Sequence, residues 1–280
     1  MNYQNSAMIY QNSAFLEMIS KSLKWREGVF LEPKGTKCIR GLKIENSYHL
    51  RRNLEGFNFF KNLYNIYNSL AIMEKQPLLS LNPGVRRGQY KKFNEDFECN
   101  VKYYDFALDI DVKNFADLKC ALYDVKKIYN LFRSYKVKFQ VRCSGSGFHI
   151  VVPWYETDSI NLKIQERVKL FGDLAEYLRL FLNLEYIDMS IYDIRRIWKT
   201  PFSLDRNTNN LCLPLFENEI FEFDYSIVDP ELYLNMNLKE LYQELGSRNN
   251  NLFQGKEGNF IGMIDSMWGG EWQEKIEQQK

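Results

Sequence analysis

The sequence lacks the cysteine and histidine patterns of a disulfide-bonded or zinc-binding domain. Its 280 residues contain five cysteines and two histidines, and the cysteines are widely separated with no CxxC pair. Scattered residues of this kind supply no credible set of four ligands for a structural zinc ion. We therefore expect no zinc, and we expect reduced thiols at Cys38, Cys99, Cys120, Cys143 and Cys212.

Long apolar runs are missing as well. No stretch of about 18 apolar residues occurs, which argues against a membrane-spanning helix. The first residues do not follow the basic, apolar and small-residue order of a secretory signal. A GxxxxGK[ST] loop is also absent, so no helicase segment is fused to the chain. These absences favour a cytoplasmic location and no membrane partner.

Neither sign of charge dominates, because 37 Lys and Arg stand against 36 Asp and Glu, for a net charge of +1. Such a chain has no overall attraction to nucleic acid, so binding would need a local basic patch. Two basic segments with interleaved aromatic residues qualify, at 21–43 and 84–92; the second contains Arg86, Arg87, Lys91 and Lys92. Taken alone, each is better explained as a solvated basic face.

What the sequence does contain is the composition of a folded globule, with 45% hydrophobic and 26% charged residues. Apolar spacing predicts helices over 47–70, 114–132 and 164–182. A strand is predicted over 103–112, a hairpin over 137–153, and further strands over 211–216 and 220–223. This order indicates an α+β fold, with an antiparallel or mixed sheet covered by helices.

Two carboxylates stand out on the strand predicted over 103–112. Asp109 and Asp111 are two residues apart, so they point to the same side of a strand, about 7 Å apart along it. Like charges placed together repel, and a divalent cation with oxygen ligands, Mg²⁺ or Mn²⁺, is the usual relief. An isolated DxD pattern also occurs often by chance.

The hairpin turn SGSGFH offers groups that suit a phosphate. Glycines such as Gly145 let backbone N–H groups approach an anion closely, Ser144 adds a hydroxyl, and His149 adds an imidazole. The bland alternative is a flexible turn with a satisfied histidine. Further along, Asp188 precedes a basic segment with Arg196 and Lys199, which could complete a metal site and hold a triphosphate. The alternative there is a connection with an exposed basic face.

In this order the three motifs resemble the signature of the archaeo-eukaryotic primase superfamily, and they read FALDIDV, CSGSGFHIVVP and IDMSIYDIRRIWKTPFSLDRNTNNLCLPL. The resemblance covers about residues 100–225 and is especially close to the catalytic subunit of replicative primases. It implies a helical and sheet N-terminal unit at 1–100 that carries the basic segments. That unit would pack on an RRM-like module at 101–230 holding the motifs, and an appendage would follow at 231–280.

The same resemblance assigns roles to single residues. It implies that Asp109, Asp111 and Asp188 are catalytic and bind two divalent ions, Mg²⁺ or Mn²⁺. It implies nucleotide contacts from the turn and from the basic segment, at Ser144, Gly145, His149, Arg196, Lys199 and Ser203. One departure is Asp205, which stands where the family often has a histidine. This departure leaves open the preference for ribo- or deoxyribonucleotides.

The resemblance implies a template-dependent DNA primase-polymerase, a nucleotidyltransferase that joins NTPs or dNTPs on single-stranded DNA and releases pyrophosphate. Two alternatives stay open. A gap-filling or end-joining polymerase of the same superfamily would extend primers without starting them. A catalytically idle subunit would bind nucleic acid only, although three repelling carboxylates argue against it. The sequence does not choose among replication, plasmid or viral, repair and CRISPR-associated settings, or name a second subunit.

Overall fold

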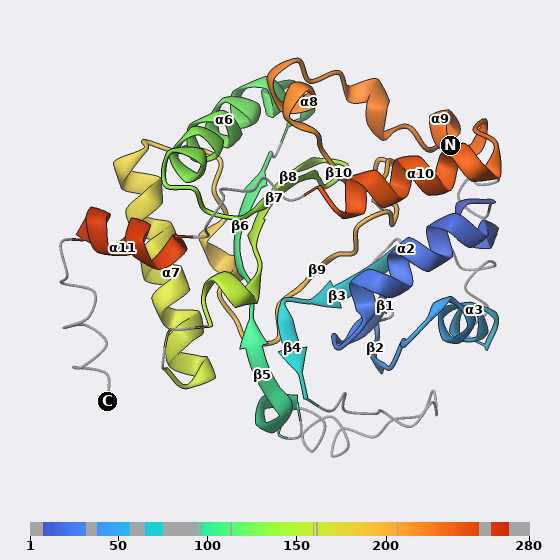
Figure 1. The fold of residues 1–280 in the computed structure, drawn as a ribbon, viewed down its shortest axis with the longest axis horizontal. Helices are drawn as coiled ribbons and strands as arrows, with labels where there is room; N and C mark the ends of the chain where they lie inside the picture. Colours follow the sequence, from blue (N-terminus) through green and yellow to red (C-terminus); the bar gives the residue numbers. More distant parts are fainter. Residues whose placement is uncertain are drawn as a thin grey trace.

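A computed structural model describes residues 8–31, 38–56, 65–74, 95, 97–112, 114–158, 160, 162–205, 207–251 and 259–268. It has the expected α+β architecture, built on antiparallel sheets with helices packed against them (Figure 1). No helix in these ranges is long and apolar enough to cross a membrane.

The first sheet has the strand order β2-β1-β3-β9 and is antiparallel throughout. Its strands are β1 (Gly28–Leu31), β2 (Cys38–Leu42), β3 (Asn65–Ser69) and β9 (Ile197–Lys199). Two helices accompany it, α2 (Ser13–Leu23) and α3 (Ser47–Gly56), which pack on each other. The side chain of Asn12 caps α2 by accepting from the Ala14 N–H, and α2 buries a stripe that includes Phe15, Ile19 and Leu23.

The second sheet has the order β10-β7-β8-β6. Its strands are β6 (Phe106–Asp111), β7 (Gln140–Cys143), β8 (Gly147–Val152) and β10 (Leu213–Pro214). The helices α6 (Leu118–Ser134) and α7 (Ile164–Phe181) follow β6 and β8 in the chain. This strand–helix–hairpin–helix order is that of an RRM-like module. On the free side of β6, Ile110 forms an isolated antiparallel bridge with Ile187, where a further strand could otherwise pair.

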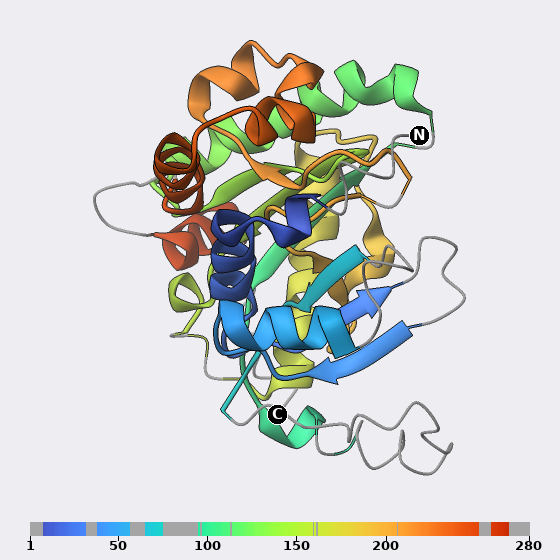
Figure 2. The same ribbon diagram turned by 90° about the vertical axis from the view of Figure 1, so that its right-hand side faces the viewer.

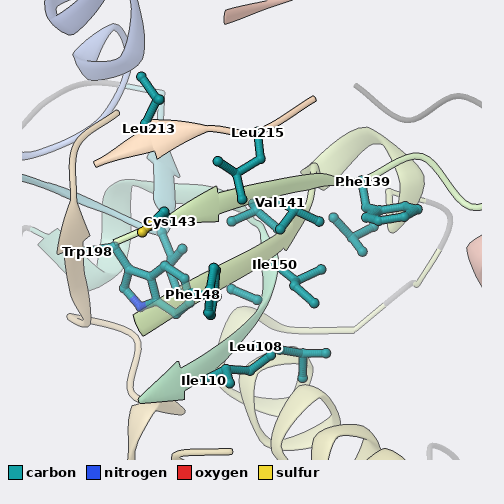
Figure 3. Packing of buried hydrophobic residues seen from close by; sticks show 14 of the residues in the cluster. Leu108, Ile110, Phe139, Val141, Cys143, Phe148, Ile150, Trp198, Leu213 and Leu215 are labelled. Carbon is teal, nitrogen blue, oxygen red and sulfur yellow. The ribbon is translucent and has the colours of Figure 1, made fainter. Parts of the chain in front are cut away.

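The two faces of this second sheet differ in character. Leu108, Ile150 and Val141 lie side by side in register on β6, β8 and β7, and their face is apolar (Figure 3). Both α6 and α7 pack on it, so it forms the main core. The opposite face carries Asp109 and His149, because successive side chains on a strand alternate. Figure 2 shows the first sheet, with α2 and α3, lying against the part of the chain that contains the second sheet.

Elements from the C-terminal part of the chain connect these units. They are α8 (Glu217–Phe221), α9 (Pro230–Leu234), α10 (Leu238–Asn249) and α11 (Phe260–Trp268). Helix α10 packs on α2, and Arg248 of α10 forms an ion pair with Glu219 at 2.6 Å. The Phe260 ring contacts that of Phe106 at 5.2 Å. Elements from all three expected stretches, 1–100, 101–230 and 231–280, pack together. The division at residues 100 and 230 therefore stays a prediction.

Several expected boundaries were wrong. Helix α3 ends at Gly56, and Tyr67 lies on strand β3; residues 57–64 lie outside the described ranges. The strand expected over 103–112 is divided at Asp105 into β5 (Val101–Tyr104) and β6, and β5 pairs with β4 (Ala71–Met73) instead. Asp105 turns inward to pair with Arg26 at 2.6 Å, which ends the regular alternation. The strand expected over 220–223 is not formed, because residues 220 and 221 belong to helix α8. Glu219 caps this helix by accepting from the Phe216 N–H.

Candidate active site

The candidate site is built on the polar face of the second sheet. In register, Asp109 of β6 lies opposite His149 of β8, and His149 lies opposite Arg142 of β7. The His149 Nε2 atom is 3.7 Å from Asp109 Oδ1, and its ring packs 4.1 Å from the ring of Trp198. Burial, with the nearby charges of Lys199 and Arg142, holds the pKa of His149 well below its usual range. The imidazole is therefore neutral at pH 7.

The backbone brings the third carboxylate of the expected triad beside the first. The Asp188 N–H donates to the Asp109 carbonyl at 2.8 Å, and the Asp111 N–H donates to the Tyr186 carbonyl at 3.0 Å. Burial raises the pKa of Asp109 to about 7, and the charges of Asp111 and Asp188 add to this effect. The pKa of Asp111 is also raised, again mainly by burial. The site thus places carboxylates where their charges repel.

The Asp188 side chain points to other partners. It accepts from the Ser190 N–H at 2.8 Å and from the Ser190 hydroxyl at 3.0 Å, and Arg196 lies 3.5 Å from Oδ2. Within the described residues, no three His, Cys, Asp or Glu side chains stand close enough together to enclose a metal ion. The carboxylate oxygens of Asp109 and Asp111 are nevertheless the kind of ligand that a hard divalent ion prefers, and the half-buried Asp109 is repelled by its neighbours. Asp188 would have to turn from Arg196 to join them.

The turn between β7 and β8 admits only glycine at two positions. Gly145 has φ +92°, and a Cβ added there would lie 2.5 Å from Asp205 Cβ. A Cβ on Gly147 would lie 2.4 Å from the Ile110 carbonyl oxygen of β6. The Ser144 N–H donates to the Gly147 carbonyl at 2.8 Å and closes the turn. The glycines therefore let this turn pack directly against both β6 and the segment after β9.

We expect Gly147→Ala to destabilise the fold by at least about 2 kcal/mol, because the clash is with backbone that cannot move independently. Gly246→Ala in α10 is the matched control, since nothing lies within 4 Å of an added Cβ there. That change should raise stability by up to about 1 kcal/mol through helix propensity. Urea unfolding of both variants measures the difference. Equal stabilities would contradict the close packing at Gly147.

The basic residue Lys199 is held against the turn. Its ammonium donates to the Ser144 carbonyl at 2.7 Å and forms an ion pair with Asp205, which is almost fully buried. Burial disfavours the Lys199 charge, but Asp205 outweighs it, so the pKa of Lys199 is raised. Asp205 also accepts from the Thr208 N–H at 3.0 Å. The one proton of the Thr208 hydroxyl is shared, because Oγ1 lies 3.0 Å from both Asp205 Oδ2 and the Gly145 carbonyl oxygen. Asp205 thus fixes both Lys199 and the glycine turn.

These groups line one cavity of about 280 Å³. Its wall includes the predicted residues Asp109, Asp111, Ser144, His149, Arg196 and Lys199. Asp188 reaches the wall only through its contact with Arg196. Ser203 does not reach it: the side chain is fully buried, and its hydroxyl donates to the Ile66 and Thr200 carbonyls. The basic residues Arg86, Arg87, Lys91 and Lys92 lie outside the described residues.

Sequence reasoning missed part of the wall, namely Tyr67, Ser146, Ile197, Trp198, Asp205 and Asn207. Tyr67 comes from the first sheet, and its register opposite Lys199 in the β3–β9 pair brings it to the site. No local pattern signals that pairing. Asp205 did have a signal, because it lies six residues after Lys199 in a stretch that the motifs already marked.

The raised pKa of Asp109 predicts a pH effect on stability in the absence of divalent ions. A carboxyl group with a raised folded pKa binds more protons in the folded state, so its contribution to stability falls as pH rises from about 4 to about 7. His149 acts oppositely, since its lowered pKa makes stability rise as pH rises toward about 6.5. Asp109→Asn removes only the first contribution.

We therefore expect the variant to gain more stability than the parent between pH 5 and pH 7.5, by on the order of 2 kcal/mol. Urea unfolding in EDTA across this range measures the difference, and Asp117→Asn is the control because that side chain makes no capping hydrogen bond. Parallel curves for parent and variant would show that the pKa of Asp109 is ordinary.

Comparison with known proteins finds similarity only among solved structures. No family model and no curated protein matches the chain. The polymerase domain from Mycobacterium tuberculosis ligase D in complex with DNA aligns with 12% identity and a TM-score of 0.48, covering 94% of this chain and 92% of that one. The AEP domain of the cyanophage S-2L primase-polymerase aligns with 10% identity and a TM-score of 0.38, covering 80% and 90%. At these values neither similarity assigns an activity to this chain.

Proposed function

We propose that the chain is a template-dependent DNA primase-polymerase that transfers nucleotides from NTPs or dNTPs to a 3′-hydroxyl on single-stranded DNA. The observation that supports this most is the composition of one cavity. Asp109 and Asp111 face it together with Lys199 and Arg196. From the turn, Ser144 and Ser146 line it, whereas Gly145 does not. Carboxylates for cations beside basic groups for a polyphosphate suit transfer of a nucleotide with release of pyrophosphate.

Asp109 and Asp111 would hold divalent ions, Mg²⁺ or Mn²⁺, and Asp188 would join them after leaving Arg196. When bound, such ions would lower the pKa of the attacking hydroxyl and neutralise charge on the α-phosphate. Electrostatic repulsion would favour cation binding, because the half-buried Asp109 carboxylate is repelled by both other carboxylates.

The basic side of the cavity would hold the triphosphate. Lys199 is fixed by Ser144 and Asp205, so its charge is placed before the nucleotide arrives. Arg196 is half-buried and pairs with Asp188 at 3.5 Å. Nucleotide phosphates would compete for Arg196 and so release the Asp188 carboxylate. His149 is neutral, and it would therefore contribute a hydrogen bond and not a charge.

The deciding experiment is synthesis on unprimed and on primed single-stranded DNA, with Mg²⁺ or Mn²⁺ and with NTPs or dNTPs supplied separately. We expect new oligomers on the unprimed template, resolved on a denaturing gel. Products on the primed template alone would replace the proposal with a polymerase that only extends primers. DNA binding without synthesis on either template would favour a catalytically idle subunit. The two nucleotide pools report the sugar preference, which the site residues leave open.

A further inference from the structure

The side chain of Arg40 is 26% exposed, although Arg40 lies in the basic segment at 21–43. Its Nε donates to Glu27 Oε1 at 2.9 Å, and its Nη2 donates to Glu27 Oε2 at 2.7 Å. The Glu27 side chain is 1% exposed and also accepts from the Gly41 N–H at 3.0 Å. Burial disfavours the Arg40 charge, but the hydrogen bonds and the charge of Glu27 outweigh it, so the pKa of Arg40 is raised. Arg40 is thus a cation held inside the protein in a defined position.

Arg40 has a further partner beside the candidate active site. Its Nη2 donates to the Arg195 carbonyl at 3.0 Å, across 155 positions of the chain. The next residue, Arg196, lines the cavity and pairs with Asp188 at 3.5 Å. Arg196 comes directly before β9 and belongs to no strand. Its position therefore depends on single hydrogen bonds and not on a regular ladder.

Hydrogen bonds hold both peptide groups that flank Arg196. In the group before it, the Arg196 N–H donates to the Asp193 carbonyl at 2.8 Å, and the Arg195 carbonyl accepts from Arg40. In the group after it, the Arg196 carbonyl accepts from the Leu70 N–H at 3.3 Å. Asp193 and Leu70 contribute backbone atoms to these bonds, whereas Arg40 contributes its side chain. A substitution at Arg40 can therefore release one side of Arg196 while the backbone partners stay in place.

We propose that Arg40 is a positioning residue, which holds the peptide group before Arg196 and so aims the Arg196 guanidinium into the cavity. Glu27 fixes Arg40 in turn. Rotation of that peptide group would change φ of Arg196 and move its side chain, because φ and ψ are the soft dihedrals of the backbone. The inference rests on the proposed function in one respect, namely that Arg196 binds the triphosphate. It also gives Arg40 a task other than the nucleic-acid contact expected of its segment.

The first measurement uses the chain without nucleotide, DNA or metal ion. Amide hydrogen exchange, resolved at single residues by NMR, reports on the peptide group before Arg196 through the Arg196 N–H. We expect Arg40→Met to speed its exchange at least about tenfold, because a charge-assisted hydrogen bond that opposes local opening is lost. The Asp188 N–H, which donates to the Asp109 carbonyl at 2.8 Å, is the internal reference and should not change.

A second variant separates this effect from a loss of stability. Arg40→Met alone leaves the Glu27 carboxylate buried without a counter-charge, so it should lower the melting temperature. Adding Glu27→Gln removes that charge, and the double variant should recover much of the melting temperature while exchange at Arg196 stays fast. Lys43→Met is the matched control, because Lys43 belongs to the same basic segment but is 44% exposed and pairs with Glu45. It should alter neither exchange nor melting.

The second measurement is nucleotide incorporation on a primed template. We expect the double variant to raise KM for the nucleotide about tenfold, because its Arg196 is no longer aimed at the triphosphate. KM for the primed DNA should stay within about twofold of the parent value, and Lys43→Met should leave KM for the nucleotide unchanged. A purely structural role for Arg40 would lower the active fraction and leave both KM values as they are.

Fast exchange at Arg196 together with a raised KM for the nucleotide supports the inference. Exchange at Arg196 that is no faster than in the parent overturns it, and so does fast exchange with both KM values unchanged. A raised KM for DNA alone also overturns it, because Arg40 would then contact nucleic acid directly. A parent that incorporates no nucleotide contradicts the proposed function. In that case exchange at Arg196 by itself decides whether Arg40 holds this residue.

Discussion

Asp109→Asn combined with Asp111→Asn is expected to reduce nucleotide incorporation on a primed template by at least about a thousandfold. The same double variant should melt at a higher temperature than the parent in EDTA. Both effects have one cause: the carboxylates that would hold divalent ions repel each other in the folded chain, and burial raises the pKa of Asp109 to about 7. Few inactivating substitutions stabilise a fold. Loss of incorporation together with a higher melting temperature would therefore point to the repelling carboxylates as the cause.

Incorporation rates and thermal melting on the same preparations measure this prediction. Asp117→Asn is the matched control, because it removes a carboxylate from the start of α6 that makes no capping hydrogen bond. It should change neither rate nor melting temperature appreciably. A double variant that loses activity and also melts lower would mean that the two carboxylates serve the fold. Retained activity would mean that Asp109 and Asp111 are not catalytic residues.

The second large effect concerns the buried pair of Lys199 and Asp205. Asp205→Ala should destabilise the fold by about 3–5 kcal/mol, since it leaves the Lys199 ammonium buried without a counter-charge. It also removes the acceptor for the Thr208 N–H and hydroxyl, which brace the glycine turn. Lys199→Met in the Asp205→Ala background should cost much less than Lys199→Met alone, because no buried charge then remains.

A double-mutant cycle by urea unfolding measures this coupling, which should exceed about 2 kcal/mol. Asp158→Ala is the control, an exposed carboxylate outside the cavity wall. Additive effects at Lys199 and Asp205 would show that Ser144, which accepts from Lys199 at 2.7 Å, suffices to hold the ammonium.

The sequence predicted those parts of the fold that depend on local patterns. The amphipathic spacing located α6 and α7, and the glycine-bearing turn located the β7–β8 hairpin. Period-two alternation also placed Asp109 and Asp111 on one face of a strand. These features need only residues a few positions apart, so the sequence alone reveals them.

Long-range partners decide what the sequence could not reveal. Asp105 interrupts the predicted strand because Arg26, between α2 and β1, pairs with it. Tyr67 reaches the cavity because β3 pairs with β9. Ser203 looked like a nucleotide contact in its motif, yet its hydroxyl is used by the carbonyl of Ile66, 137 positions earlier in the chain. Each of these features depends on a contact with a residue that is far away in the sequence.

The pairing of β9 with β3 affects how the protein folds during synthesis. Lys199, which faces the cavity, lies on a strand that belongs to the first sheet, opposite Tyr67. During synthesis β1, β2 and β3 emerge early, and the outer edge of β3 stays unpaired until β9 arrives. An exposed edge of this kind is a template for aggregation until it is covered. The edge of β3 is therefore exposed over this interval, and the cavity wall is complete only when β9 brings Lys199 opposite Tyr67.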